Sequence, residues 1–217
     1  MVLGIYGAGG LGREVLELAK CINCTDKKWE KFVFIVDGAA SNVVNGINVY
    51  SYEQAIEEFG ASLEIILGIG EPSTRERLLK KITNDRISLA TLIHPNVYIP
   101  DSTTVGKGVV IQVGCFISCN VFISDNVFIQ PHATIGHDDR INEGAIVSSF
   151  CGLSGNVSVG KHSYIGVGTV VREGVAIGDY SIIGMASAVY KDIPDEMIAM
   201  GNPARPMKRN EEHHVFG

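Results

Sequence analysis

The sequence lacks basic clusters and long apolar runs. Its net charge is −6, which argues against nucleic acid as the main partner. No apolar stretch approaches the ~18 residues that a membrane helix needs, so we expect no membrane partner. Met1 leads directly into a short strand-like run and a glycine cluster, so no signal peptide is expected.

Paired cysteines are also missing. The five cysteines are an odd number without a regular spacing, and Cys21 and Cys24 form a single CxxC without a second pair, so zinc is not expected. Cys115 and Cys151 are interpreted as small core residues. Together these features predict a reducing, cytoplasmic setting.

Aromatic residues make up only 7% of the chain, whereas it holds 25 glycines and 46% hydrophobic residues. This composition supports a packed core with many tight turns. The length of 217 residues fits one large domain or two small ones.

The C-terminal half repeats every six residues. Stepping by six from Ile93 meets an aliphatic residue seventeen times in a row, and the next step, Asp195, ends the series. The members are Ile93, Ile99, Val105, Ile111, Ile117, Ile123, Ile129, Ile135, Ile141, Val147, Leu153, Val159, Ile165, Val171, Ile177, Ile183 and Val189.

The residue two positions before each aliphatic residue is nearly always small, with Asp139 as the exception. One large and one small inward residue per six suit a short strand and a corner, and three such units close a triangular coil of 18 residues. Coils stack ~4.8 Å apart and bury their inner faces only by stacking. The repeat therefore predicts a parallel β-helix of about five coils.

This repeat resembles that of the hexapeptide-repeat acyltransferases. The resemblance implies a left-handed β-helix and a homotrimer, and the segment GNPAR, Gly201 to Arg205, is similar to the C-terminal signature of that family.

The N-terminal half has the pattern of a small nucleotide-binding unit. A strand at residues 3–6 precedes a GxGxxG made by Gly7, Gly9 and Gly12, and an apolar helical face follows. A second strand ends at Asp37, 25 residues after Gly12 and near the spacing of a ribose contact. The alternative is that these glycines only permit close packing.

Ser51 and Ser73 both begin patterns typical of capping boxes, and residues 65–69 are expected to form a buried strand before Gly70. We therefore predict an α/β unit of βαβ type at 1–90, a β-helix acyltransferase domain at 91–208 and a C-terminal tail at 209–217. Use of NAD is not expected, because the unit is short and no dehydrogenase-like domain follows it.

The GAGGLGRE start, the LGIG strand end and the hexapeptide coil together resemble the sialic-acid O-acetyltransferase and nucleotide-aminosugar N-acetyltransferase family. In that family the N-terminal unit holds the nucleotide and the β-helix holds acetyl-CoA. The resemblance places the nucleotide contacts here at Gly9, Gly10, Leu11, Asp37, Gly38 and Gly70, and Arg75 is a weaker candidate for phosphate. Backbone N–H groups at a helix N-terminus would bind the phosphates without a basic surface.

His137 occupies a corner of the repeat, two residues after Ile135, and is expected to point away from the coil, where a neighbouring subunit can complete its pocket. The residue stacked on it one coil later is Gly155, which offers space for an acyl group and a free N–H. A neutral imidazole can accept the proton of an attacking amine or hydroxyl, a neighbouring carboxylate can fix its tautomer, and an N–H can stabilise the oxyanion.

The family resemblance makes His137 the general base and Asp138 its acidic partner, with Asp139 as the open alternative. It also implies acetyl-CoA as co-substrate, contacted by Gln130, Gly155, Val167 and Met185, and no metal. Ile146 stands where some relatives carry a second histidine, which leaves one contact to CoA in doubt.

The leading hypothesis is an N-acetyltransferase that acts on a UDP- or dTDP-linked 4-amino sugar, in polysaccharide or glycan synthesis. An O-acetyltransferase for a sugar or sialic acid would use the same site. A zinc hydratase needs about three histidines around one metal, and His94, His132 and His162 are poorly spaced for that role. A non-enzymatic scaffold or sensor of nucleotide sugars is the remaining alternative.

Overall fold

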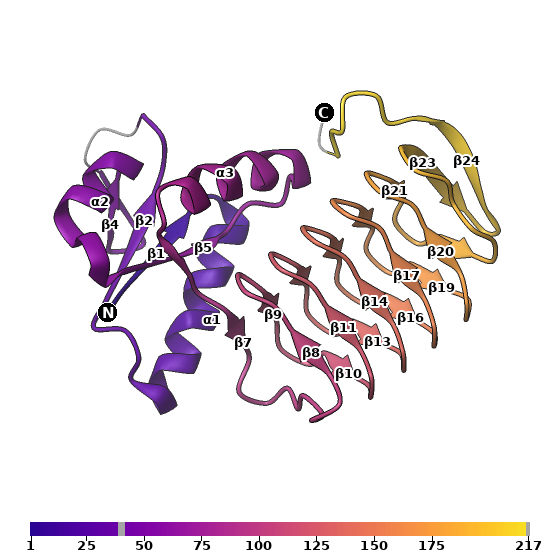
Figure 1. The fold of residues 1–217 in the computed structure, drawn as a ribbon, viewed down its shortest axis with the longest axis horizontal. Helices are drawn as coiled ribbons and strands as arrows, with labels where there is room; N and C mark the ends of the chain where they lie inside the picture. Colours follow the sequence, from indigo (N-terminus) through magenta and orange to yellow (C-terminus); the bar gives the residue numbers. More distant parts are fainter. Residues whose placement is uncertain (39–41, 216–217) are drawn as a thin grey trace.

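A short sheet flanked by helices leads into a long triangular coil (Figure 1). The structure is a computed structural model and describes residues 1–38 and 42–215. The last strand of this sheet, β6, ends at Leu89, and the first strand of the coil, β7, begins at Leu92. The proposed boundary near residue 90 lies between these two strands. We call the described residues up to Leu89 the N-terminal unit and those from Leu92 to Arg209 the β-helix.

The N-terminal unit contains a sheet of order β3-β4-β2-β1-β5-β6. Its strands are β1 (Val2–Tyr6), β2 (Lys31–Ile35), β3 (Asn42–Val44), β4 (Ile47–Tyr50), β5 (Leu63–Leu67) and β6 (Ser88–Leu89). The central strands β2, β1 and β5 are parallel, as the βαβ prediction requires, and Tyr6 is in register with Ile35 and Leu67. The antiparallel β3–β4 pair was not predicted from the sequence.

Helices cover both faces of this sheet. They are α1 (Gly10–Asp26), α2 (Tyr52–Phe59) and α3 (Pro72–Asn84), with a 3-10 turn at Gly60–Ser62. Alternate residues of β1 point to opposite sides: Leu3 and Ile5 pack with α1, whereas Tyr6 packs with α2 and α3.

One of the two predicted capping boxes is confirmed. The Ser51 side chain accepts a hydrogen bond from the Gln54 N–H, and the Gln54 side chain bonds back to Ser51. The prediction for Ser73 is wrong. Pro72 fixes the first turn of α3 and Glu71 is the N-cap residue, so Ser73 already lies inside the helix.

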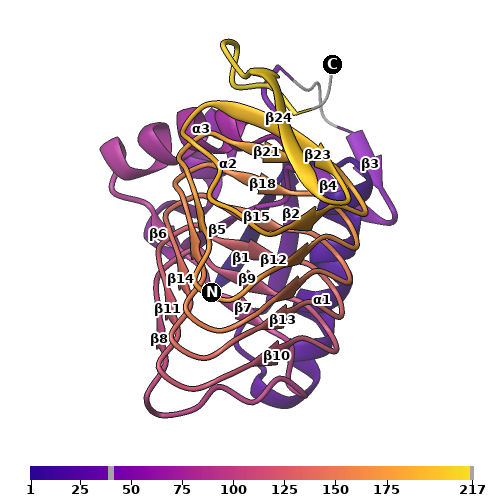
Figure 2. The same ribbon diagram turned by 90° about the vertical axis from the view of Figure 1, so that its right-hand side faces the viewer.

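The β-helix contains three parallel sheets joined at three edges (Figure 2). One sheet contains β10 (Phe116–Ile117), β13 (Thr134–Ile135), β16 (Gly152–Leu153), β19 (Val170–Val171) and β22 (Ala188–Val189). A second contains β8 (Thr104–Val105), β11 (Phe122–Ile123), β14 (Arg140–Ile141), β17 (Ser158–Val159) and β20 (Ala176–Ile177). The third contains β7 (Leu92–Ile93), β9 (Val110–Ile111), β12 (Phe128–Ile129), β15 (Ile146–Val147), β18 (Tyr164–Ile165), β21 (Ile182–Ile183), β23 (Met197–Gly201) and the antiparallel β24 (Ala204–Arg209).

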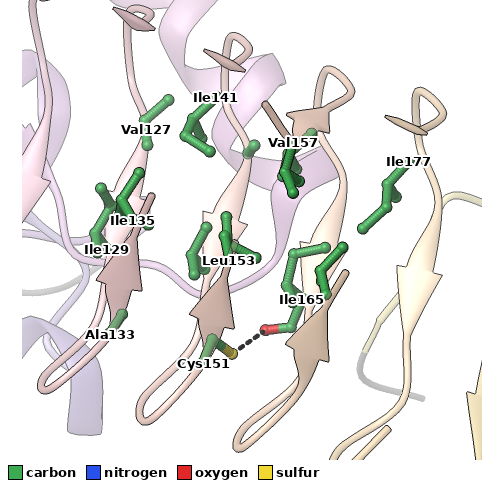
Figure 3. Close-up of a cluster of buried hydrophobic side chains, with 14 of the residues drawn as sticks. Val127, Ile129, Ala133, Ile135, Ile141, Cys151, Leu153, Val157, Ile165 and Ile177 are labelled. Atoms are coloured by element: carbon green, nitrogen blue, oxygen red, sulfur yellow. Dashed lines mark hydrogen bonds between the residues drawn. The ribbon is translucent and has the colours of Figure 1, made fainter. Parts of the chain in front are cut away.

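The predicted register of 18 residues is confirmed. Ile117 pairs with Ile135, and Ile135 pairs with Leu153. The aliphatic series and the small residues before it fill the interior, as seen for Ile135, Leu153 and Cys151 in Figure 3.

The series breaks where the spacing changes. Ile177 bridges to Ile193 and Ile183 pairs with Ala199, which are steps of 16 residues. The last coil is therefore two residues shorter, which explains why Asp195 stands outside the series. The GNPAR segment spans the end of β23, the turn at Asn202 and Pro203, and the start of β24.

Helix α1 lies between the N-terminal sheet and the β12 sheet of the β-helix. Val110, Phe128 and Ile146 point out of the coil, yet they are buried in the same apolar cluster as Leu16 of α1. The N-terminal unit thus covers one of the three coil sheets.

The described part of the predicted tail folds back toward α3 (Figure 1). The Val215 N–H donates to the Glu71 carboxylate at 3.1 Å, and the His213 ring stacks on Tyr180 at 4.2 Å. Arg209 belongs to β24 rather than to the tail, and residues 216–217 lie outside the described part. None of the described helices is long and apolar enough to cross a membrane.

Candidate active site

His137 lies in the turn between β13 and β14. We name this corner of the coil the His137 edge; it comprises residues 118–121, 136–139, 154–157 and 172–175. The His137 side chain is half exposed, with 50% of its surface accessible, so it points away from the coil interior as predicted.

Asp138 holds one nitrogen of this imidazole. The His137 Nδ1 lies 2.8 Å from Asp138 Oδ2. The hydrogen bond to Asp138 raises the pKa of His137 above its ordinary value, and the same bond lowers the pKa of Asp138. An ionised carboxylate accepts the proton of Nδ1–H, which leaves the lone pair on Nε2.

Asn120 supports this carboxylate and was missed in the sequence. Its Nδ2 donates to Asp138 Oδ1 at 3.1 Å. Asn120 stands one coil, 18 residues, before Asp138, so the repeat register would have identified it. Asp138 adopts a left-handed backbone conformation (φ 62°), which Asp and Asn tolerate better than most residues.

Gly155 lies directly beneath the His137 ring, which confirms the predicted stacking of these two residues. A Cβ on Gly155 would overlap Cε1 and Nε2 of His137. The sequence predicts that this glycine leaves space for an acyl group, but the imidazole of the same chain fills that space. Among the described residues the Gly155 N–H has no hydrogen-bond acceptor, and its role as an oxyanion donor stays a prediction.

Asp139 does not contact the imidazole. It is fully buried and accepts hydrogen bonds from the Gly136 N–H at 2.8 Å and the Val157 N–H at 2.7 Å. No direct contact therefore supports the alternative that Asp139 orients His137. Burial raises the pKa of Asp139 to about 7, although the two backbone donors act in the opposite direction.

The residues expected to contact CoA lie on two different edges. Gly155 belongs to the His137 edge. Gln130, Val167 and Met185 lie on the corner after the β12 sheet, which we name the Val167 edge (residues 112–115, 130–133, 148–151, 166–169 and 184–187). Val167 and Met185 are 43% and 77% exposed, while Gln130 Oε1 accepts a hydrogen bond from the Ser149 N–H at 3.2 Å. One chain does not bring these residues to His137.

The predicted nucleotide contacts converge at one edge of the N-terminal sheet. The in-register ends of β1, β2 and β5 lead into residues 7–12, 36–38 and 68–70, respectively. Asp37 accepts a hydrogen bond from the Tyr6 hydroxyl at 2.6 Å. This edge, at the carboxyl ends of parallel strands, is where open α/β sheets bind ligands.

The glycines of the GxGxxG segment fall into two groups. A Cβ on Gly12 would overlap the Gly7 carbonyl, so Gly12 allows the close approach of helix and strand. A Cβ on Gly9 or Gly10 would meet no atom within 4 Å. Close packing therefore accounts for Gly12 but not for Gly9 and Gly10, which begin a helix without a side-chain cap.

Arg75 is not available to a phosphate. It is fully buried, its guanidinium donates to the carbonyls of Leu67 and Asn126, and it lies 5.5 Å from the centre of the Phe128 ring. Burial lowers its pKa to about 9. The suggestion of a phosphate contact is wrong, because Arg75 instead joins α3 to the β-helix.

The other histidines named for a metal site lie apart from His137. His132 stacks on Phe150 at 5.2 Å on the Val167 edge, and His162 is buried against Tyr180 on the third edge. His94 Nε2 lies 3.7 Å from Cys21 Sγ. The described residues contain no group of three side chains suited to a metal ion.

The architecture is that of a left-handed β-helix with an imidazole at one edge, joined to a small Rossmann-like α/β unit. Residues 2–82 match the family model described as the PglD N-terminal domain. The chain is 30% identical over 118 residues to a GDP-perosamine N-acetyltransferase of Escherichia coli O157:H7, a match that covers 54% of this chain and 53% of that relative. The chain thus spans about half the length of that relative.

Two solved structures are similar over nearly the whole chain. The acetyltransferase domain of PglB from Neisseria gonorrhoeae FA1090 is 28% identical, with a TM-score of 0.87 over 95% of this chain and 99% of that one. PerB from Caulobacter crescentus, in complex with CoA and GDP-perosamine, is 29% identical, with a TM-score of 0.87 over 96% and 98%. These matches confirm the resemblance to nucleotide-aminosugar acetyltransferases and the predicted fold class.

Proposed function

We propose that this protein transfers the acetyl group of acetyl-CoA to the amino group of a nucleotide-linked 4-amino sugar. The observation that carries the proposal is the His137–Asp138 pair at an exposed edge, with Nδ1 held at 2.8 Å and Nε2 without a partner among the described residues. The similarity to a protein named as a GDP-perosamine N-acetyltransferase, and to PerB in complex with CoA and GDP-perosamine, supports the acetyl donor and the amine acceptor.

The reaction requires one base and no covalent enzyme intermediate. His137 Nε2 removes a proton from the amino group as its nitrogen attacks the thioester carbonyl. The tetrahedral oxyanion needs a fixed donor, for which we propose the Gly155 N–H. The carbon–sulfur bond then breaks, and the CoA thiolate takes the proton from the His137 imidazolium.

The nucleotide would bind at the carboxyl edge of the N-terminal sheet. The N–H groups of Gly10 and Leu11, at the start of α1, suit the diphosphate because a helix N-terminus favours anions. Asp37, Gly38 and Gly70 lie at the same edge and are proposed to contact the nucleoside.

We propose that the complete site forms between two copies of the chain, in a homotrimer. The N-terminal unit covers the sheet opposite the His137 edge, so one copy does not supply both halves. The β10 sheet joins the Val167 and His137 edges and exposes Phe116 and Val170, which are 60% and 52% accessible. In a closed ring, the Val167 edge of one copy would face the His137 edge of the next.

The activity is tested with acetyl-CoA and a panel of UDP-, dTDP- and GDP-linked 4-amino sugars, with NMR to locate the acetyl group. N-acetylation of one acceptor, lost ~10²-fold or more in His137→Ala with the fold intact, is the expected result. Acetyl on a sugar oxygen would establish the rival O-acetyltransferase. A thermal shift with the nucleotide sugar but not with acetyl-CoA would favour a sensor.

The shared site is tested by co-expressing His137→Ala with Gly10→Trp, a variant that fills the proposed nucleotide cradle. Each variant alone should be inactive. If each site combines two copies, random mixing restores about a quarter of the sites. Absence of any recovery in mixed oligomers would contradict a site shared between copies.

A further inference from the structure

We infer that Asp139 is a positioning residue, whose buried carboxylate sets the position of His137 over Gly155. The inference rests on the proposed function, because it assigns a part in catalysis to a residue that does not touch the substrate. Three structural observations lead to it.

The first observation is a comparison with the same inward position in other coils. Thr103, Cys115, Ser163 and Thr169 each donate from their side chain to a carbonyl 15 residues later. Two of these four side chains also accept the N–H of the residue 18 later: Thr103 from Val121 at 3.2 Å and Ser163 from Ser181 at 3.0 Å. Small hydroxyl or thiol side chains therefore join one turn to the next.

Asp139 keeps half of this pattern and replaces the other half. Oδ1 accepts the N–H of Val157, which is 18 residues later, as a hydroxyl would. Among the described residues Asp139 forms no hydrogen bond to the carbonyl of Ser154, which is 15 residues later. Its second oxygen instead accepts the Gly136 N–H from the same turn.

The second observation is a missing backbone hydrogen bond between two successive coils. The residue after each inward aliphatic residue normally donates its N–H to the next coil, as Ser118 does to Ile135 and Ser154 to Val171, each at 3.1 Å. Among the described residues, Gly136 does not make the corresponding bond to Leu153, because its N–H points to Asp139. The exception falls at the residue just before His137.

The third observation is that the His137 turn has little freedom on its other sides. The His137 carbonyl accepts the Asn156 N–H at 2.8 Å, and the ring rests on Gly155. Asp139 therefore fixes the start of the turn, through Gly136, and its height above residues 155–157, through Val157. A displacement of this turn would move Nε2 away from the amine, and small misplacements of reacting groups lower rates strongly.

The test uses Asp139→Ser, which reproduces the side chain of Ser163 and can still bond to Val157 but cannot hold Gly136. We expect the variant to fold, its kcat to fall ~10- to 100-fold, and its KM for both substrates to change less than ~3-fold. Hydrogen exchange of the Gly136 amide should accelerate. The matched control is Ser163→Ala, which removes the equivalent side chain beside His162, a buried histidine that the proposed reaction does not use, and should leave kcat unchanged.

Wild-type kcat in Asp139→Ser, with accelerated exchange at Gly136, would overturn the inference. Equal losses of kcat in Asp139→Ser and Ser163→Ala would also overturn it, because the effect would then belong to coil stability. Asp139→Asn is the second variant if serine fails to fold; it keeps the volume but replaces one acceptor oxygen with a donor. Should the wild-type protein acetylate no acceptor of the panel, the proposed function fails, and the effect of Asp139 on the turn is still read from the Gly136 exchange and the NMR tautomer of His137.

Discussion

The imidazole of His137 rests on the Cα of Gly155 in the adjacent coil, and any larger residue at 155 would occupy the place of the ring. A glycine in one coil thus determines where a side chain of the preceding coil can lie. The two residues are 18 positions apart in the sequence, yet they lie in adjacent coils.

Gly155→Ala should therefore displace the ring and lower kcat ~10²-fold, because the base leaves its position relative to the acceptor. The matched control is Gly152→Ala in the same coil, where a Cβ would meet its nearest atom, Val170 Cγ1, at an ordinary 3.6 Å. Steady-state kinetics of both variants, with acetyl-CoA as donor, check this prediction. Near-normal turnover in Gly155→Ala would show that the ring position seen here is not needed.

Asp138→Asn should shift the pH profile. The bond to Asp138 raises the pKa of His137, and His137 acts as a base only when neutral, so the acid limb of the wild-type profile lies above that of an ordinary imidazole. Removing the charge lowers the pKa of His137 and moves the limb to lower pH, while kcat at the plateau falls ~10-fold or more because the tautomer is no longer fixed.

Glu173→Gln provides the comparison for that shift. Glu173 also raises the pKa of His137, but through its charge alone and less than the bond to Asp138 does. We expect a smaller shift in the same direction and little change in plateau kcat. A profile for Asp138→Asn that coincides with the wild-type profile would remove His137 as the titrating base.

The β-helix could be predicted almost completely from the sequence, because each inward position is read directly from a six-residue period. The position of His137 at a corner and its stacking on Gly155 followed from the same register. The last coil departs from the period by two residues, which the pairings of Ile177 with Ile193 and of Ile183 with Ala199 reveal.

Side-chain contacts between distant segments could not be predicted in this way. Arg75 has the charge and location of a phosphate ligand in the sequence, yet its partners are Leu67 and a residue 51 positions away, Asn126. The outward residues Val110 and Phe128 are likewise buried, because α1 covers them. Such contacts depend on how two units pack, which no local periodicity encodes.

We expect one glycine of the N-terminal loop, Gly12, to be needed for stability and another, Gly9, for nucleotide binding. Gly12→Ala forces a Cβ into the Gly7 carbonyl and should lower the free energy of unfolding by ~3 kcal/mol or more. Gly9→Ala meets open space at an ordinary φ of −72°, so stability should stay near that of the wild type. The affinity of this variant for the nucleotide should nevertheless fall, because the added methyl group lies at the proposed diphosphate site. Calorimetry with free nucleoside diphosphates measures this affinity. Unchanged affinity in Gly9→Ala would place the nucleotide elsewhere.

Arg75→Ala should destabilise the protein without a direct effect on nucleotide binding. The substitution leaves the buried carbonyls of Leu67, Ile69 and Asn126 without their donor, which should lower the free energy of unfolding by ~2–4 kcal/mol. Arg77 is the matched control, since it lies exposed on the same helix and its replacement by alanine should cost less than ~0.5 kcal/mol. Urea denaturation measures both values. A phosphate ligand would behave in the opposite way: Arg75→Ala would then weaken nucleotide binding and leave the unfolding midpoint almost unchanged.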